Sequence, residues 1–138
     1  MSKLKAFLQP SVAGTTLAVI VSDRFKDEEG KPQPFVIQAI SQEENEALAE
    51  QCRKDRIIDG IPMKMLDDTA YSKHLMLACV KEPDLKDSEL CRYYGVVDPL
   101  DVLSKMLSIG EYQILTKEVM QINGLKSKQE RLKEAKNS

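Results

Sequence analysis

The chain has 138 residues, of which 42% are hydrophobic and 30% are charged, so its length fits one domain with a modest core. Its net charge of −2 argues against a nucleic-acid-binding protein, because such proteins carry a basic face. The N-terminus lacks the apolar segment of a secretory signal, and no apolar run approaches the ~20 residues of a membrane-spanning helix. We therefore expect a soluble, cytoplasmic protein that binds neither nucleic acid nor membrane.

Residues 1–14 are expected to form a flexible N-terminal arm. Leu4, Phe7 and Leu8 have the spacing of one helical turn. Gly14 then interrupts any regular structure before the first β-type run begins.

Residues 15–40 are predicted to form an antiparallel β-hairpin. Two β-branched apolar runs, Thr15–Val21 and Pro34–Ile40, flank a polar loop rich in turn-forming residues, which is a hairpin pattern. Alternate residues of the second run share one face: Phe35, Ile37 and Ala39. Because an isolated hairpin is marginally stable and its exposed edges tend to pair, we expect self-association through this hairpin.

Residues 41–125 are predicted to contain about five short helices. The first and last begin at capping boxes, in which a serine and a glutamate three residues later bond each other's backbone N–H groups; these are Ser41 with Glu44 and Ser108 with Glu111. The other three begin near aspartates that can act as N-caps: the Asp67-Asp68 pair, Asp84 and Asp98. The predicted fold is therefore α+β and mostly α-helical, with a single domain over residues 15–125.

Two segments lack helix signals. Residues 55–68 contain Gly60 and Pro62 and are predicted to be a loop, with a short extended piece at Ile57–Ile58. Residues 126–138 are charged and nearly devoid of apolar side chains. They are expected to form a disordered tail or a frayed helix.

The sequence predicts no catalytic, cofactor-binding or metal-binding residue. Cys52, Cys79 and Cys91 are expected to be free and packed, and His74 is the only histidine; the short paired spacing of a zinc site is missing. The acidic stretch at residues 23–30 lacks the ligand spacing of a calcium-binding loop. Nucleophile and phosphate-binding motifs are missing as well, so we do not expect an enzyme.

Residues 82–125 instead have the composition of a binding module, rich in Leu, Met, Val, Ile and Tyr. Neighbouring Tyr93 and Tyr94 lie ~100° apart on a helix, so the two rings are not expected to be equally buried. Two alternatives stay open: both rings are partly buried at the helix end, or one anchors the core while the other reaches an interface, where tyrosine is enriched. Methionine is common on adaptable binding surfaces. The residues predicted to contact a partner are Tyr93, Tyr94, Leu103, Met106, Tyr112 and Met120.

The same region resembles the C-terminal half of XkdN-like phage tail assembly chaperones. The matching elements are Cys79-Val80, Glu82–Leu85, Tyr94–Val96, Leu103–Leu107, Gly110–Tyr112 and Gln121–Gly124. The N-terminal half agrees in outline, with a hairpin followed by a polar helix. The resemblance covers roughly residues 11–125 and rests on the order and spacing of these elements.

This resemblance implies a protein of a tailed phage or prophage that acts in the host bacterial cytoplasm and is absent from the mature virion. Its implied partners are the tape measure protein, which it keeps soluble, and the tail tube protein, whose subunits it helps to recruit. Related chaperones often occur in a second, longer form made by ribosomal frameshifting. We expect residues 98–107 and 109–123 to form the docking face for the tape measure protein, with Tyr93 or Tyr94 at its edge.

Three other functions remain open from the sequence. The chain could be a structural head–tail or tube-completion protein, which would be present in purified virions. It could be a small adaptor that binds a host factor. An enzyme with an unrecognised site is the third alternative, and a specific bound ligand or metal would favour it.

Overall fold

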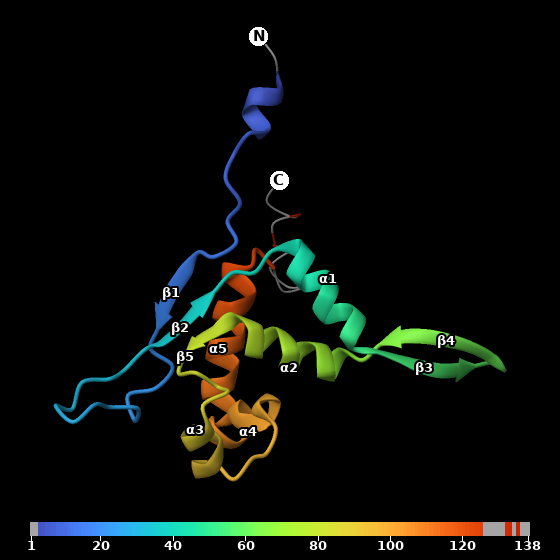
Figure 1. Cartoon of the computed structure of the whole chain (residues 1–138). Coiled ribbons are helices and arrows are strands. Elements are labelled where there is room, and N and C mark those ends of the chain that lie inside the picture. The colour runs from blue at the N-terminus through green and yellow to red at the C-terminus, as the bar shows by residue number, and fades with distance from the viewer. Residues whose placement is uncertain (1–2, 126–131, 134, 136–138) are drawn as a thin grey trace.

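The computed structural model describes residues 3–125 and positions 132, 133 and 135. A body of helices around a small sheet carries two projections, the N-terminal arm and a hairpin made by β3 (Arg53–Ile58) and β4 (Ile61–Leu66) (Figure 1). The charged tail predicted for residues 126–138 lies largely outside the described residues.

The sheet has three antiparallel strands in the order β1-β2-β5. β1 (Thr16–Val19) and β2 (Phe35–Gln38) pair with Leu17 opposite Ile37, as the N-terminal hairpin prediction requires. β5 (Val80–Glu82) pairs with the other edge of β2. The mixed α+β class is confirmed, but the strands are not confined to an N-terminal hairpin. The sequence did not predict β5, because three residues directly after a helix carry no strand periodicity of their own.

One face of β2 supplies much of the hydrophobic core. Phe35, Ile37 and Ala39 are exposed by only 2%, 0% and 1%, which confirms that they share the inward face. The intervening Val36 and Gln38 are half-buried. Burial of one face therefore fixes the register of this hairpin, since a shift by one residue would turn the apolar side chains outward.

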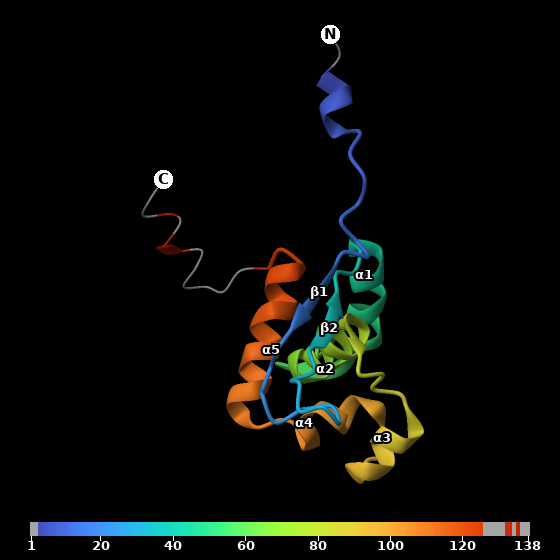
Figure 2. The same cartoon turned by 90° about the vertical axis from the view of Figure 1, so that its left-hand side faces the viewer.

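Three helices cover the sheet and one another. α5 (Ile109–Ile122) packs against β1 and β2, and α2 (Asp68–Cys79) packs against β5 and α5. α1 (Gln42–Gln51) packs against α2 (Figure 2). The core between these elements is made of the following buried side chains: Val19, Val21, Phe35, Ile37, Leu75, Met76, Cys79, Val80, Leu85, Cys91, Val102, Leu103, Met106, Leu115 and Val119.

Both predicted capping boxes are present. The Ser41 hydroxyl accepts a hydrogen bond from the Glu44 N–H at 3.1 Å, and the Ser108 hydroxyl accepts one from the Glu111 N–H at 3.2 Å. Each glutamate carboxylate accepts in return from the serine N–H. These local exchanges satisfy the first backbone donors of α1 and α5, which explains why both helices begin where the sequence predicts.

The helix predicted to begin near Asp68 does so, and Asp67 of the predicted Asp67-Asp68 pair caps α2 by accepting from the Ala70 N–H at 3.2 Å. One other N-cap differs by a few residues from the prediction. Asp87, rather than Asp84, caps α3 (Ser88–Tyr93). Asp84 instead accepts from the N–H of the residue two positions on, in an Asx turn that precedes the helix.

The segment before α5 contains a short 3-10 helix, Pro99–Asp101, that runs into α4 (Val102–Met106). The Asp98 carboxylate accepts from the Leu100 N–H at 3.0 Å, and the proline occupies the first helical position as predicted. With α3, this region forms the end of the body that lies farthest from the N-terminal arm (Figures 1 and 2).

The loop predicted for residues 55–68 is wrong, because β3 and β4 form a regular antiparallel hairpin there. Asp59 and Gly60 have positive φ values of 52° and 77°, the signature of a tight type I′ turn. Pro62 is tolerated because it lies in an edge strand, opposite Ile57. The Asp-Gly dipeptide was the available signal for this hairpin, and the neighbouring proline concealed it.

The N-terminal arm extends away from the body. A 3-10 helix, Lys3–Phe7, is followed by exposed residues up to Val12. The chain joins the sheet at Gly14, whose N–H donates to the Ala39 carbonyl at 2.9 Å.

Candidate protein-interaction surfaces

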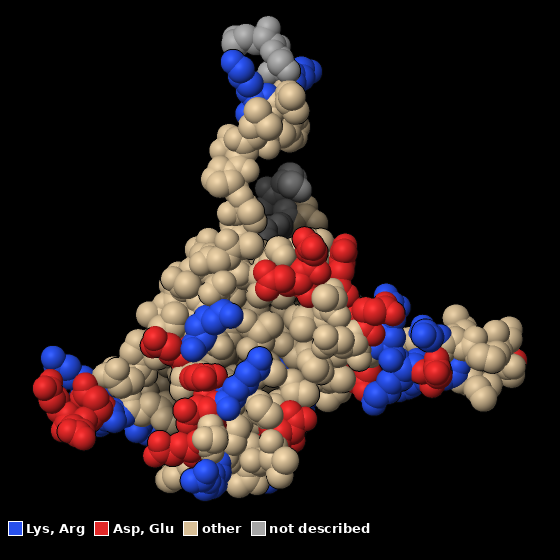
Figure 3. Space-filling view, viewed as in Figure 1, with Lys and Arg blue, Asp and Glu red and all other residues tan. Residues whose placement is uncertain are grey.

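The β3–β4 hairpin carries a group of exposed large apolar side chains: Ile57, Ile58, Ile61, Met63, Met65 and Leu66. Every residue of both strands is exposed, and the hairpin extends sideways from the junction of α1 and α2 (Figure 1). Charged side chains lie near its base and uncharged ones toward its tip (Figure 3). An isolated two-stranded hairpin is only marginally stable in water, and large exposed apolar patches mark interaction sites.

The register divides the hairpin into two faces, because directly opposed residues share a face and neighbours along a strand alternate. One side, which we call the methionine face, consists of Lys54, Arg56, Ile58, Ile61, Met63 and Met65. The opposite face consists of Arg53, Asp55, Ile57, Pro62, Lys64 and Leu66. The methionine face therefore places an apolar column beside two basic side chains.

Polar contacts fix the base of the hairpin to the body. The Lys54 ammonium lies 2.6 Å from the Asp67 carboxylate, and the Asp67 N–H donates to the Cys52 carbonyl at 2.8 Å. The hydrogen bond from Lys54 holds the pKa of Asp67 below its usual value, so this carboxylate is ionised at neutral pH. Arg53 pairs with Glu50 at 3.2 Å. The base of the hairpin is therefore held in place by polar contacts, while its middle and tip face solvent.

A second surface is the hollow between α4 and α5. It has a volume of about 370 Å³ and is lined by Ser104, Leu107, Ser108, Ile109, Tyr112 and Gln113. Ile109 is 82% exposed although it is a large apolar residue. The hollow therefore offers an apolar contact at the first turn of α5.

An ion pair holds the α4–α5 corner in place. The Arg24 guanidinium donates to both Glu111 carboxylate oxygens, at 2.8 and 2.7 Å, and to the Met106 carbonyl at 2.5 Å. This arginine also lies over the Phe25 ring, 4.2 Å from its centroid. The hydrogen bonds from Arg24, and then that from the Ser108 N–H, hold the pKa of Glu111 far below its usual range. The loop after β1 is thereby tied to the start of α5.

A third surface is the hollow at α3, with a volume of about 380 Å³. Its lining combines apolar and acidic residues: Pro83, Asp84, Asp87, Glu89, Leu90 and Tyr93. Tyr93 is 80% exposed and meets the Tyr94 ring edge to face at a centroid distance of 4.9 Å. Tyr94 packs against the core. The two adjacent tyrosines therefore differ in burial, with Tyr94 partly buried against the core and Tyr93 facing solvent.

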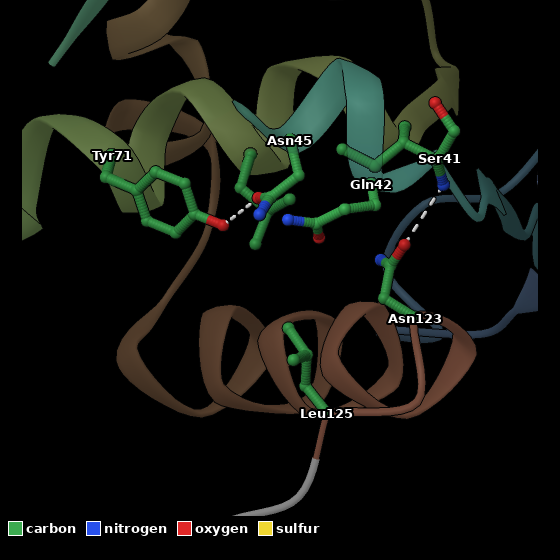
Figure 4. Close-up of a pocket in the computed structure, with 8 residues that line it drawn as sticks. Ser41, Gln42, Asn45, Tyr71, Asn123 and Leu125 are labelled. Atoms are coloured by element: carbon green, nitrogen blue, oxygen red, sulfur yellow. Dashed lines mark hydrogen bonds between the residues drawn. The ribbon is translucent and has the colours of Figure 1, made fainter. Parts of the chain in front are cut away.

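The pocket between α1, α2 and α5 is a hydrogen-bonded seam (Figure 4). The Tyr71 hydroxyl donates to the Asn45 side-chain oxygen, and the Ile40 N–H donates to the Asn123 side-chain oxygen at 3.0 Å. Burial raises the pKa of the Tyr71 hydroxyl and of the Cys79 thiol, so both groups are protonated at neutral pH. This arrangement joins three helices and provides no activated nucleophile.

The six residues predicted to contact a partner do not form one surface. Leu103 and Met106 are buried in the core, with exposures of 4% and 7%. Tyr94, Tyr112 and Met120 are half-buried, and Tyr93 is exposed in a different hollow from Tyr112. We leave Leu103 and Met106 out of any docking surface, because a partner could reach their side chains only by opening the core. Helical spacing identifies an apolar stripe, but it does not tell whether that stripe faces the core or a partner.

The three cysteines are free and buried. In the described part of the chain, no three His, Cys, Asp or Glu side chains gather closely enough to hold a metal ion. Among the same residues, no helix is both long and apolar enough to cross a bilayer.

Comparison with known proteins places these surfaces in context. The family model described as phage XkdN-like tail assembly chaperone protein matches residues 4–136. Protein YqbN of Bacillus subtilis (strain 168) is 29% identical over 134 residues, which cover 94% of this chain and 90% of YqbN. The phage-like element PBSX protein XkdN of the same organism is 28% identical over 137 residues, with 96% and 93% covered.

The fold is also found in a solved structure. The crystal structure of YqbN matches with a TM-score of 0.72 and 25% sequence identity, over 91% of this chain and 99% of that chain. The similarity therefore extends across nearly the whole length of both proteins.

Proposed function

The chain belongs to the phage XkdN-like tail assembly chaperone family, and from this premise we propose that it binds the tape measure protein and helps to recruit tail tube subunits. Family membership gives it a role in phage tail assembly rather than in catalysis. We further propose that it acts in the host bacterial cytoplasm and is absent from the mature virion.

The observation that supports this proposal is the exposed methionine face of the β3–β4 hairpin. A tape measure protein is a long helical rod whose apolar stripes are uncovered before the tube encloses it. Unbranched methionine side chains adapt to different apolar partners, which suits Met63 and Met65, exposed by 49% and 39%. We propose that this face lies along a stripe of the rod, with Arg56 directed at acidic side chains beside it.

The hollow between α4 and α5 is proposed as a second contact with the same partner. Ile109 and Tyr112 line this hollow and belong to the docking face, residues 98–107 and 109–123, that we expected from the sequence. Each of the two contacts is shallow and weak. Many copies of the chain bound to one tape measure protein would still bind it tightly as a group. Weak individual contacts also allow release when tube subunits replace the chaperone.

The test is co-expression of the chain with its tape measure protein, followed by size-exclusion chromatography with light scattering. We expect a soluble complex with the wild type and an insoluble tape measure protein without it. Met63→Asp should abolish the complex, because it places a charge in the apolar column of the methionine face. An equally soluble tape measure protein in the absence of the chain would contradict the chaperone proposal.

The chain offers a matched control on the same hairpin. Ile57→Asp introduces the same charge on the opposite face, at a residue that is 76% exposed. This variant should retain the complex, and circular dichroism should show that both variants are folded. Loss of binding in both variants, or in neither, would remove the methionine face from the proposal.

A further inference from the structure

The N-terminal arm and the α3 hollow lie at opposite ends of the molecule and differ in charge. Lys3 and Lys5 are the only charged side chains before Asp23. Phe7 and Leu8 are exposed by 79% and 67%. The arm is therefore a short basic segment with large apolar side chains turned toward solvent.

The α3 hollow has the complementary composition. Its lining combines apolar and aromatic side chains, those of Pro83, Leu90 and the exposed Tyr93, with three acidic residues, Asp84, Asp87 and Glu89. The lining contains no basic residue. Such a hollow favours an apolar segment that carries positive charge, because apolar burial is then combined with charge attraction.

We propose that the N-terminal arm of one copy docks in the α3 hollow of the next copy. Phe7 and Leu8 pack against the apolar side chains of the hollow, and Lys5 lies against the carboxylate of Glu89. The arm points away from the hollow of its own chain, and the body lies between them in both views (Figures 1 and 2). The contact is therefore between molecules.

This contact joins two different patches, so it is heterologous and leaves a free arm and a free hollow at the ends of each assembly. Such contacts produce open chains unless the rotation between copies closes a ring. The association was expected from the sequence at the edges of the β1–β2 hairpin. The arm and hollow instead provide a directional contact that leaves the β3–β4 hairpin uncovered.

The inference does not depend on the proposed function, because it concerns this chain alone. If the chain also binds a tape measure protein, head-to-tail contacts would place successive copies along the rod and raise the effective concentration of each. If the chain does not self-associate, the proposal that it binds a tape measure protein is unaffected.

The experiment uses two variants of the full chain. The arm variant combines Lys5→Glu with Phe7→Asp, and the hollow variant combines Glu89→Lys with Tyr93→Ala. All four side chains are exposed, so we expect both variants to fold as the wild type does, which thermal unfolding checks. Analytical ultracentrifugation then measures the weight-average mass from about 10 μM to about 1 mM, the range suited to weak contacts.

The wild-type mass should at least double over this range, and each variant alone should stay monomeric. A mixture of the two variants should form dimers and nothing larger, because the intact arm of one fits the intact hollow of the other. A chain with both Lys5→Glu and Glu89→Lys should regain association through the reversed charges. Monomeric wild type, an associating single variant, or a mixture that stays monomeric would each overturn the proposal.

Discussion

The molecule contains two antiparallel hairpins that differ in what holds them together. The β1–β2 hairpin spans a long polar loop, and its inward face is enclosed by α5 and the rest of the core. The β3–β4 hairpin closes through a two-residue turn, and all its strand residues are exposed. The first depends on tertiary packing and the second on local turn geometry and cross-strand pairs.

This difference separates stability from binding. Apolar side chains in the first hairpin contribute to the free energy of folding because they leave water when the chain folds. Apolar side chains in the second remain exposed to water in the folded chain, and we propose that a partner covers them. Equivalent substitutions in the two hairpins should therefore affect different properties. A substitution in the β1–β2 hairpin should change the free energy of unfolding, and one in the β3–β4 hairpin should change association with a partner.

The largest expected effect is the substitution Ile37→Ala in β2. Ile37 is fully buried, so removing three carbon atoms leaves a cavity and should lower the free energy of unfolding by about 2–5 kcal/mol. Urea denaturation followed by circular dichroism measures this change. A loss below about 1 kcal/mol, as expected for an exposed site, would show that this hairpin is not part of the core.

The next effect concerns the Arg24–Glu111 pair at the start of α5. Glu111→Gln should lower the free energy of unfolding by about 1–2 kcal/mol at neutral pH, a modest value because Arg24 is half exposed. The folded state lowers the pKa of Glu111, so the pair stabilises the fold above the ordinary glutamate pKa of about 4.3 and progressively less below it. Urea denaturation at pH ~6 and pH ~3 should show the wild type losing more stability than the variant. Equal losses would mean that the pair does not form.

A smaller and local effect is expected from Gly60→Ala at the turn of the β3–β4 hairpin. A side chain at this positive φ costs about 1–2 kcal/mol, which should speed amide hydrogen exchange in β3 and β4 and leave β1 and β2 unchanged. The control is Gly110→Ala in the first turn of α5, where φ is not positive and a Cβ meets nothing within 4 Å. Faster exchange throughout the protein would contradict the independence of the two hairpins.

The smallest effect on folding should come from Met63→Ser on the methionine face. This side chain is already half exposed, so we expect the free energy of unfolding to change by no more than about 0.5 kcal/mol. Urea denaturation measures the change beside that of Ile37→Ala. A loss of several kcal/mol would show that the methionine face packs against the body and is not available to a partner.

The parts of the fold that could be predicted are those encoded by local interactions. The capping boxes at Ser41 and Ser108 and the alternation around Ile37 depend on residues within one helical turn or one strand. The pairing of β5 with β2 and the contact of Arg24 with Glu111, 87 residues apart, depend on how distant elements meet. A short window of one sequence contains no pattern that predicts contacts between elements so far apart in the chain.

The candidate surfaces were harder to predict than the elements. An apolar stripe indicates that a helix is covered, but a stripe facing the core and one facing a partner have the same periodicity. Leu103 was therefore expected at an interface and lies in the core. Conversely, Gly60 and Pro62 led to the prediction of a loop over residues 55–68, although glycine suits a tight turn and proline at an edge position is compatible with a strand.

Because the β3–β4 hairpin closes through a two-residue turn, its length can change by insertions in its two strands. The cross-strand hydrogen bonds of this hairpin are satisfied between its own two strands, so residues inserted as matched pairs would lengthen it without altering the body. One added residue per strand would exchange the two faces at the tip, whereas two would extend it by about 7 Å with the same facing. Insertions in this segment that preserve function should therefore favour even increments in each strand.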